Sequence, residues 1–425
     1  MSSKVVSLFL LFLFASISFS QQDQSLIKEG APNIFIDCSY CDLNYIKEQI
    51  PIVNYVRDRK EADIHILFSY QTTGSGGTET SLFYIGQRMF AGLNDTVKFS
   101  TIQSESKDEQ RAKLVKTIKL GLARYIGKSK IADQMTISYT KPQAKTETQN
   151  DDWDFWLFRT SLNTYFYGQE STGYLYLNGS ISASRVTEEL KLSFSLSNSY
   201  SENSYSYNNN DFISLSRSTS LNASIIKSFT DKWSWGFWTG AYKSTYSNID
   251  LSYNISPGIE YNFFPYSESN RRQLRAGYKI SYIQNKYIKE TVYFKTEETL
   301  WSQTANLTLS LIEQWGSLSF SLYGANFLYD FNKYGIGVDS QCSLNLVKGL
   351  SLNLYGSYSK IRNQITLPRA GATLEEVLLQ RTQLETGYYF YGSIGFSYSF
   401  GSIYNNIVNP RFGNSAGGYW PTVSN

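Results

Sequence analysis

Histidine, cysteine and proline are scarce in this chain of 425 residues, which has one His, three Cys and eight Pro. A single imidazole excludes metal centres built from several histidines, and it confines histidine-dependent catalysis to the surroundings of His65. A surplus of one charge sign is also lacking, because 39 Lys and Arg face 36 Asp and Glu. Binding to a nucleic-acid backbone needs clustered basic residues, so we expect no nucleic-acid partner.

Long apolar runs are missing after the N-terminus, so no helix of the roughly 20 residues that cross a bilayer is expected. The segment Met1–Gln22 has a charged start, a short apolar stretch and small residues at Ser16, Ser18 and Ser20. That is the layout of a cleaved export signal, and we assign it to residues 1–20. A membrane anchor is the weaker alternative because the apolar stretch is too short. The exported chain is then either soluble or a β-barrel.

Aromatic residues are abundant, at 16% of the chain, and unevenly spread. All eight Trp and 27 of the 34 Tyr follow residue 150, which we therefore place at a domain junction. The predicted organisation after the signal is an α/β domain over 31–130, a linker over 131–151, a transmembrane β-barrel over 152–402 and a C-terminal extension over 403–425.

Residues 31–130 predict an α/β domain with the order β-α-β-β-β-α. The predicted strands are 32–37, 62–71, 81–90 and 95–102, and the predicted helices are 42–56, with a break at Pro51, and 108–126. The second helix places Leu114, Ile118, Leu122 and Tyr125 on one face. This layout resembles the N-terminal α/β domain of the periplasmic protein TolB and its relatives.

Cys38 and Cys41 form a C-x-x-C motif between the first strand and the first helix. A helix N-terminus lowers a thiol pKa, which would suit redox chemistry, but an exported compartment is oxidising. We favour a local structural disulfide, with free buried thiols and redox activity or metal binding as alternatives. Two cysteines alone make a poor zinc site, so we expect no metal. His65 lies in an alternating strand and is interpreted as an ordinary strand residue.

From residue 152 onward, long alternating stretches separated by polar turns predict an antiparallel, closed transmembrane β-barrel of about twelve strands. In KLSFSLSNSY, Leu192, Phe194 and Leu196 alternate with serines, which gives one lipid side and one polar lumen side. A soluble β-sandwich or β-helix is the alternative, but its strands are usually shorter. The predicted strands are 153–167, 173–186, 189–201, 212–229, 233–247, 250–264, 271–285, 297–313, 317–329, 333–346, 350–363 and 387–400.

Loop lengths predict how the barrel is oriented. The turns after even-numbered strands are mostly short, whereas the three longest connections, at 201–211, 285–298 and 363–386, all fall on the other side. Outer-membrane barrels have short periplasmic turns and long outer loops, so we expect the N-terminal domain and the C-terminus in the periplasm. Six tryptophans near strand ends suit the headgroup level as interfacial anchors. They are Trp153, Trp156, Trp233, Trp235, Trp301 and Trp315.

Two stretches of the chain resemble known barrel families. RDRKEADIHILFSYQTTGSGGTETSLFYIGQ and LPRAGATLEEVLLQRTQLETGYYFYGSIGFSYSFGSIYNNIVNPRFG resemble a group of uncharacterised Gram-negative outer-membrane barrel proteins. TDKWSWGFWTGAYKSTYSNIDLSYNISPGIEYNFF is similar to the YdiY-like, salt-induced outer-membrane barrels. The resemblance implies an outer-membrane location and a barrel fold, but no reaction and no catalytic residues.

The last long loop contains GATLEEVLLQRTQLET, a segment of helix-forming composition. Thr373 followed by Glu376 has capping-box spacing. One interpretation is an extracellular helical loop. The other is a plug in the lumen, with Glu375, Glu376 and Arg381 contacting the barrel wall.

These patterns predict a non-enzymatic outer-membrane protein without cofactors, acting in small-solute passage or in envelope assembly and integrity. Its expected partners are outer-membrane lipid and a periplasmic or outer-membrane protein. The alternatives are a surface adhesion module and a component of a larger complex. A barrel hydrolase is disfavoured because these enzymes use a His base, and the only His precedes the barrel.

Overall fold

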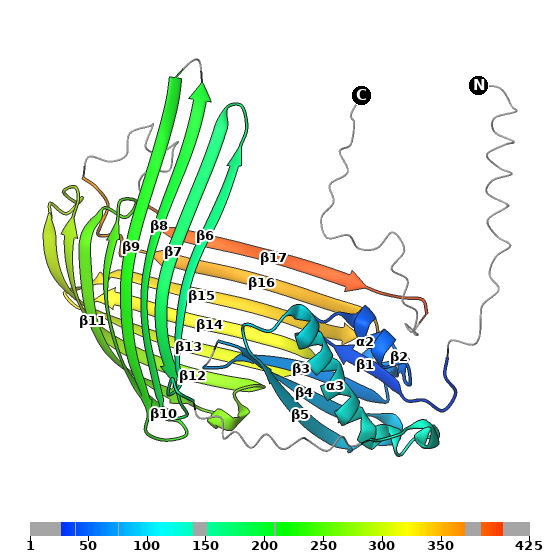
Figure 1. Ribbon diagram of the computed structural model, residues 1–425. Coiled ribbons are helices and arrows are strands. Elements are labelled where there is room, and N and C mark those ends of the chain that lie inside the picture. Colours follow the sequence, from blue (N-terminus) through cyan, green and yellow to red (C-terminus); the bar gives the residue numbers. More distant parts are fainter. Residues whose placement is uncertain are drawn as a thin grey trace, which may run out of the picture.

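The computed structural model describes residues 27–38, 40–74, 76–138, 151–207, 210–369 and 384–402 (Figure 1). They form an α/β domain with a five-stranded sheet, followed by an antiparallel sheet of twelve strands. This confirms the predicted fold class, including the number of strands. The signal segment, most of the linker and the C-terminal extension lie outside the described residues. In the described part, no helix is long and apolar enough to cross a membrane.

The α/β domain has the predicted element order, with one short strand in addition. Its strand order is β2-β1-β3-β4-β5; β1 is parallel to β2 and β3, and the other pairs are antiparallel. The predicted helix 42–56 is too long, because Pro51 cannot continue the backbone ladder and Asn54–Tyr55 pair with β1 instead. The elements are β1 (Asn33–Asp37), α2 (Leu43–Gln49), β2 (Asn54–Tyr55), β3 (Ile64–Thr72), β4 (Thr78–Gly86), β5 (Asn94–Thr101) and α3 (Lys107–Ile126).

Helix α3 closes the core of this domain. Ser106 and Glu109 form a capping box that satisfies backbone donors at its start. Its buried face packs against the sheet, and Gly121 lies so close to the Tyr84 ring of β4 that a Cβ there would be 2.1 Å from a ring carbon. Three of the four predicted face residues are fully buried, whereas Leu114 is only partly buried. The domain therefore has a complete hydrophobic core of its own.

The second sheet is a meander in which each strand is hydrogen-bonded to the next in sequence (Figure 1). Its strands lie close to the predicted ranges. They are β6 (Trp156–Gly168), β7 (Thr172–Val186), β8 (Leu190–Tyr207), β9 (Asn210–Ser228), β10 (Trp233–Ser244), β11 (Ile249–Asn262), β12 (Arg272–Tyr287), β13 (Glu297–Glu313), β14 (Gly316–Phe327), β15 (Asp330–Val347), β16 (Leu350–Ile361) and β17 (Tyr388–Tyr398).

The two faces of this sheet differ in chemistry. Hydroxyl pairs join neighbouring strands on one face, for example Ser193 with Ser224 at 2.7 Å and Ser256 with Ser281 at 2.8 Å. We call this the inner face. The outer face carries apolar side chains that stay exposed, such as Phe194 and Leu221, with exposed fractions of 43% and 38%. The alternation therefore separates a polar from an apolar face, as predicted.

The predicted closure of the barrel is not observed. The strand order runs from β17 to β6, and in the described residues no backbone pairing joins these two strands. Both are edge strands with largely exposed side chains. At the end where β6 begins and β17 finishes, each edge is bound to a different part of the α/β domain.

The connections divide into a turn end and a loop end. At the turn end lie the connections that follow β7, β9, β11, β13 and β15; at the loop end lie those that follow β6, β8, β10, β12, β14 and β16. The predicted long loop 201–211 is wrong, because β8 runs to Tyr207 and β9 starts at Asn210. Alternation continues there, and Tyr205 pairs with Phe212. The other two long connections remain, between Tyr287 and Glu297 and between Ile361 and Tyr388.

Candidate functional site

The α/β domain lies against the turn end of the twelve-stranded sheet. The face of its own sheet that helices α2 and α3 leave free meets the connection between β11 and β12. Ser69 donates to the backbone carbonyl of Asn270, and the Gln71 amide lies 3.1 Å from the Ser269 hydroxyl. The Arg271 guanidinium sits 5.3 Å from the centroid of the Phe83 ring. The two parts of the chain therefore form a specific, partly buried interface.

A charged segment, Arg57–Glu61, makes the second contact. Arg57 donates to the Phe400 carbonyl at 2.8 Å, and Arg59 donates to the Asn345 carbonyl at 2.9 Å. Asp58, which is almost buried, accepts from the Gly349 N–H. These bonds connect the α/β domain to the β15–β16 turn and to the residues after β17. Charge-assisted bonds of this kind are stronger than neutral ones.

Glu61 adds an ion pair to this contact. Its carboxylate binds Lys348 in the β15–β16 turn and, at 2.8 Å, Arg88 in its own domain. Hydrogen bonds from Lys348 and Arg88 hold the pKa of Glu61 below its usual value. The carboxylate is therefore charged at neutral pH, and the interface becomes sensitive to acid.

The third contact involves the other edge strand. Arg159 of β6 donates to the Gln103 side chain, which follows β5, at 2.7 Å. Because Arg57 binds the carbonyls of Phe400 and Gly401 beyond β17, the α/β domain is bonded to both edges of the large sheet. It therefore spans the turn end of the opening between β6 and β17.

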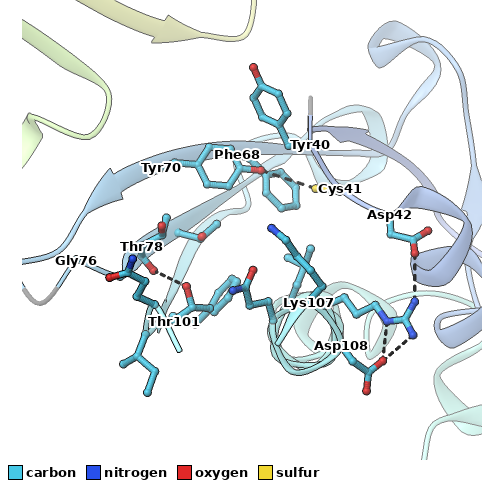
Figure 2. A pocket seen from close by; sticks show the side chains of 18 residues that line it. Tyr40, Cys41, Asp42, Phe68, Tyr70, Gly76, Thr78, Thr101, Lys107 and Asp108 are labelled. Carbon is cyan, nitrogen blue, oxygen red and sulfur yellow. Dashed lines mark hydrogen bonds and ion pairs between the residues drawn. The ribbon is translucent and has the colours of Figure 1, made fainter. Parts of the chain in front are cut away.

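A cavity of about 930 Å³ lies within the α/β domain, between the sheet and the first turns of α3 (Figure 2). Its volume is in the upper part of the ~300–1,000 Å³ range of small-molecule sites. Aromatic and aliphatic side chains form its floor. Gln103 also lines the cavity, and its side chain is bonded to Arg159 of β6. Its lining includes Tyr70, Phe68, Phe99, Leu114, Lys107 and Arg111.

The structure joins Cys38 and Cys41 in a disulfide at the wall of this cavity. Their Cα atoms are 5.8 Å apart, within the range of ordinary disulfides. The Tyr70 hydroxyl lies 2.9 Å from the Cys38 sulfur. Burial and the neighbouring Tyr40 raise the pKa of Tyr70 to about 12, so its hydroxyl keeps its proton and can donate to the sulfur. The disulfide is thus local to the β1–α2 junction, and the Tyr70 hydroxyl connects this junction to β3.

His65 is fully buried in β3, and its Nε2 atom lies 3.0 Å from an Asp37 carboxylate oxygen. Its ring also lies 5.3 Å from the Phe35 ring, centroid to centroid. The imidazole therefore has no surface open to solvent in this structure. In the described residues, no group of three or more His, Cys, Asp and Glu side chains is arranged to hold a metal ion.

At the loop end, the residues after β16 cross the inner face of the sheet. Asn248 donates to the carbonyls of Lys289 and Thr366, both at 2.9 Å. Backbone and ion-pair contacts at residues 367–369 attach the same segment to the β12–β13 connection. We call residues 363–369 the strap. Its Ile365 and Leu367 are buried.

Beneath the strap lies a second cavity, of about 640 Å³, on the inner face. Most of its lining is uncharged. Hydroxyl and amide groups come from both the sheet and the strap, and Tyr242 and Tyr323 supply aromatic surface. Lys360 is the one ionisable cation among the lining residues of the described chain. Aliphatic side chains such as Ile249 and Leu300 supply much of the remaining wall, so the cavity is amphipathic and carries little charge.

The predicted site residues fall into three groups. The two cysteines come together, as described. All six predicted tryptophan anchors are exposed, with Trp301 towards the loop end and the other five at the turn end. Glu375, Glu376 and Arg381, the predicted plug contacts, lie outside the described residues. Neither the binding of Arg57–Glu61 to the twelve-stranded sheet nor the path of the strap was predicted from the sequence.

Comparisons with known proteins give little beyond this geometry. No family model and no curated protein matches the chain. Among solved structures, the translocator domain of autotransporter NalP from Neisseria meningitidis aligns with 66% of this chain and 95% of its own, at 12% identity and a TM-score of 0.23. Values this low carry no argument about the present chain.

Proposed function

We propose that this chain is an integral outer-membrane β-barrel protein that passes small neutral solutes and is gated at both ends of its barrel. The α/β domain would lie in the periplasm and cover the turn end, while the strap covers part of the loop end. The observation that carries the proposal is the polar inner face, with a cavity under the strap and a bonded domain at the opposite end.

The exposed apolar face supports the membrane location. In water, side chains such as Phe194, Leu221 and Ile255 would form a large exposed apolar surface, whereas lipid is a suitable solvent for them. Exposed tryptophans near the strand ends suit the headgroup level. The connections that contact the α/β domain are mostly short, which is typical of the periplasmic side.

A non-enzymatic role without a cofactor is part of the proposal. It is supported by the burial of His65, the only imidazole of the chain, which has no exposed surface. The inner face is dominated by hydroxyl and amide groups, which can solvate a passing solute but supply no general base near neutral pH.

Swelling of proteoliposomes and planar-bilayer conductance test this function. We expect slow swelling in neutral sugars with the native chain and faster swelling with Asn248→Ala, because this change removes one side-chain bond to the strap and two to Lys289 beside it. Asn332→Ala, at an exposed position near the start of β15, is the matched control. No permeation by either variant above protein-free liposomes would contradict a pore.

The unpaired edges of β6 and β17 favour a second candidate, membership of a larger outer-membrane complex. Unpaired backbone groups are costly at membrane depth, so each edge needs a strand beside it. Photo-cross-linkers placed in β6 and β17 of the protein in intact envelopes would distinguish the cases. Cross-links between the two strands indicate closure within one chain, and cross-links to another protein indicate a complex.

A further inference from the structure

We propose that the cavity of the α/β domain binds a single-chain amphiphile with an anionic head, such as an alkyl carboxylate. This is a site separate from the barrel interior, and it does not depend on solute passage through the barrel. Its apolar floor and its cationic group together select this ligand class.

The floor is apolar. Phe68 in β3, Phe99 in β5 and Leu114 in α3 line the space together with the Tyr70 ring. These side chains surround a region that is large enough for an acyl chain. Burial of each methylene of such a chain contributes about 0.8 kcal/mol.

The head group must be anionic, because one exposed cation that lines the cavity lacks a carboxylate partner among the described residues. Arg111 binds Asp42 at 3.4 Å and Asp108 at 2.6 Å, so it takes both acidic side chains of the lining. Among the described residues, Lys107 has no ion pair. Figure 2 shows its side chain directed into the space below Phe68. A carboxylate placed there would gain a charge-assisted hydrogen bond.

An extended peptide fits this site less well than an acyl chain. The floor is the face of a sheet, and β4 at the floor is paired on both sides, with Thr78 opposite Thr72 and Thr101. β4 therefore offers no backbone groups for strand addition, the usual mode of peptide capture by a sheet, and among the described strands only β5 leaves an edge free on this side. An acyl chain needs no hydrogen bonds along its length.

Photo-cross-linking tests the proposal on the full chain in phosphatidylcholine nanodiscs. The probe is dodecanoate with a diazirine on its tail, and the labelled segments are mapped by mass spectrometry. We expect labelling of the segments that contain Phe68, Phe99 and Leu114, and its loss when unlabelled dodecanoate is in excess. Labelling of the outer face of the large sheet serves as the internal reference.

Lys107→Glu should lower labelling of the cavity by carboxylate probe about tenfold and raise labelling by the matching alkylammonium probe. Lys116→Glu, on the exposed side of the same helix, should change neither. Thr101→Trp, which fills the cavity, should reduce labelling by both probes. Equal labelling by the two probes in the native chain, or labelling of the outer face alone, would overturn the proposal. Neither result bears on sugar permeation through the barrel.

Discussion

In the α/β domain the apolar side chains point inward, whereas in the twelve-stranded sheet most of them point outward. Among the described residues, nearly all buried apolar side chains belong to the α/β domain. The five exceptions lie near the strap, and they are Ile249, Tyr287, Leu300, Ile365 and Leu367. The same chain is thus built for two solvents. The domain buries its core away from water, and the sheet places its apolar face where lipid can cover it.

Truncating a buried core side chain should cause the largest loss of stability, and we expect this loss for core residues of the α/β domain. Leu122 is fully buried on α3, so Leu122→Ala should destabilise this domain by about 2–5 kcal/mol. Urea unfolding followed by hydrogen exchange of α3 measures the change. Leu120→Ala, at an exposed position of the same helix, is the control. An equal loss of stability in Leu120→Ala would mean that this face of α3 also packs against another surface.

A charge on the outer face should be nearly as costly, but only in a membrane. Leu221→Arg should destabilise the sheet in lipid vesicles by about 2–4 kcal/mol if the residue lies near the bilayer centre. Ser220→Arg places the same charge on the inner face and should cost much less. Reversible urea unfolding from vesicles provides the comparison. Equal costs at the two positions would remove the distinction between the faces.

Weakening the interface should separate the two regions without unfolding either. Arg57→Ala combined with Arg59→Ala removes bonds to the carbonyls of Phe400, Gly401 and Asn345 and should cost about 1–3 kcal/mol. The Gly349 amide, which donates to Asp58, should then exchange faster. Arg124→Ala, which breaks contacts within the α/β domain only, should leave this amide protected. Unchanged exchange in the double variant would mean that the domain is held elsewhere.

Acid should weaken the same interface. Lys348 and Arg88 lower the pKa of Glu61 in the docked state, so the stabilisation is complete above the ordinary Glu pKa of about 4.3. It decreases as the pH falls below this value and is lost once the pH passes the lowered pKa. Exchange of the Gly349 amide, corrected for intrinsic rates, should therefore accelerate below about pH 4 in the native chain. Glu61→Gln should flatten this dependence.

The smallest effect is expected from an ion pair that does not connect the two regions. Lys98 lies 3.1 Å from Glu79 on the surface of the α/β domain, and both groups are substantially exposed. Lys98→Ala should change the stability by less than about 1 kcal/mol. Lys348→Ala, at the interface, should exceed it in the exchange assay. The reverse order would show that the interface ion pair is only a surface contact.

The strands could be predicted from the sequence because alternation is a local signal. The alternation in KLSFSLSNSY is enough to predict β8. The alternation of Ser and Tyr continues beyond it, and following that pattern would have predicted the longer strand. The break at Pro51 similarly marked the end of α2 before the chain reached β2. The failure there was to continue the helix past the proline.

The interface and the strap could not be predicted in this way. Arg57 and Phe400 are far apart in the sequence. A hydrogen bond from an arginine to a backbone carbonyl also requires no particular sequence motif around either residue. Asn248 binds Thr366 with equally little local trace. Closure between β6 and β17 was predicted from the series of alternating stretches, but alternation within each strand does not determine whether the first and last strands pair.

The central claim is that the twelve-stranded sheet spans an outer membrane, with the α/β domain on the periplasmic side and the loop end on the outer side. Single cysteines at Asn332, near the loop end, and at Lys116, in the α/β domain, test it in a Cys342→Ser background with a membrane-impermeant maleimide. We predict labelling at position 332 in intact cells, and at position 116 only after the outer membrane has been permeabilised. Labelling at position 116 in intact cells, with position 332 protected, would contradict the account.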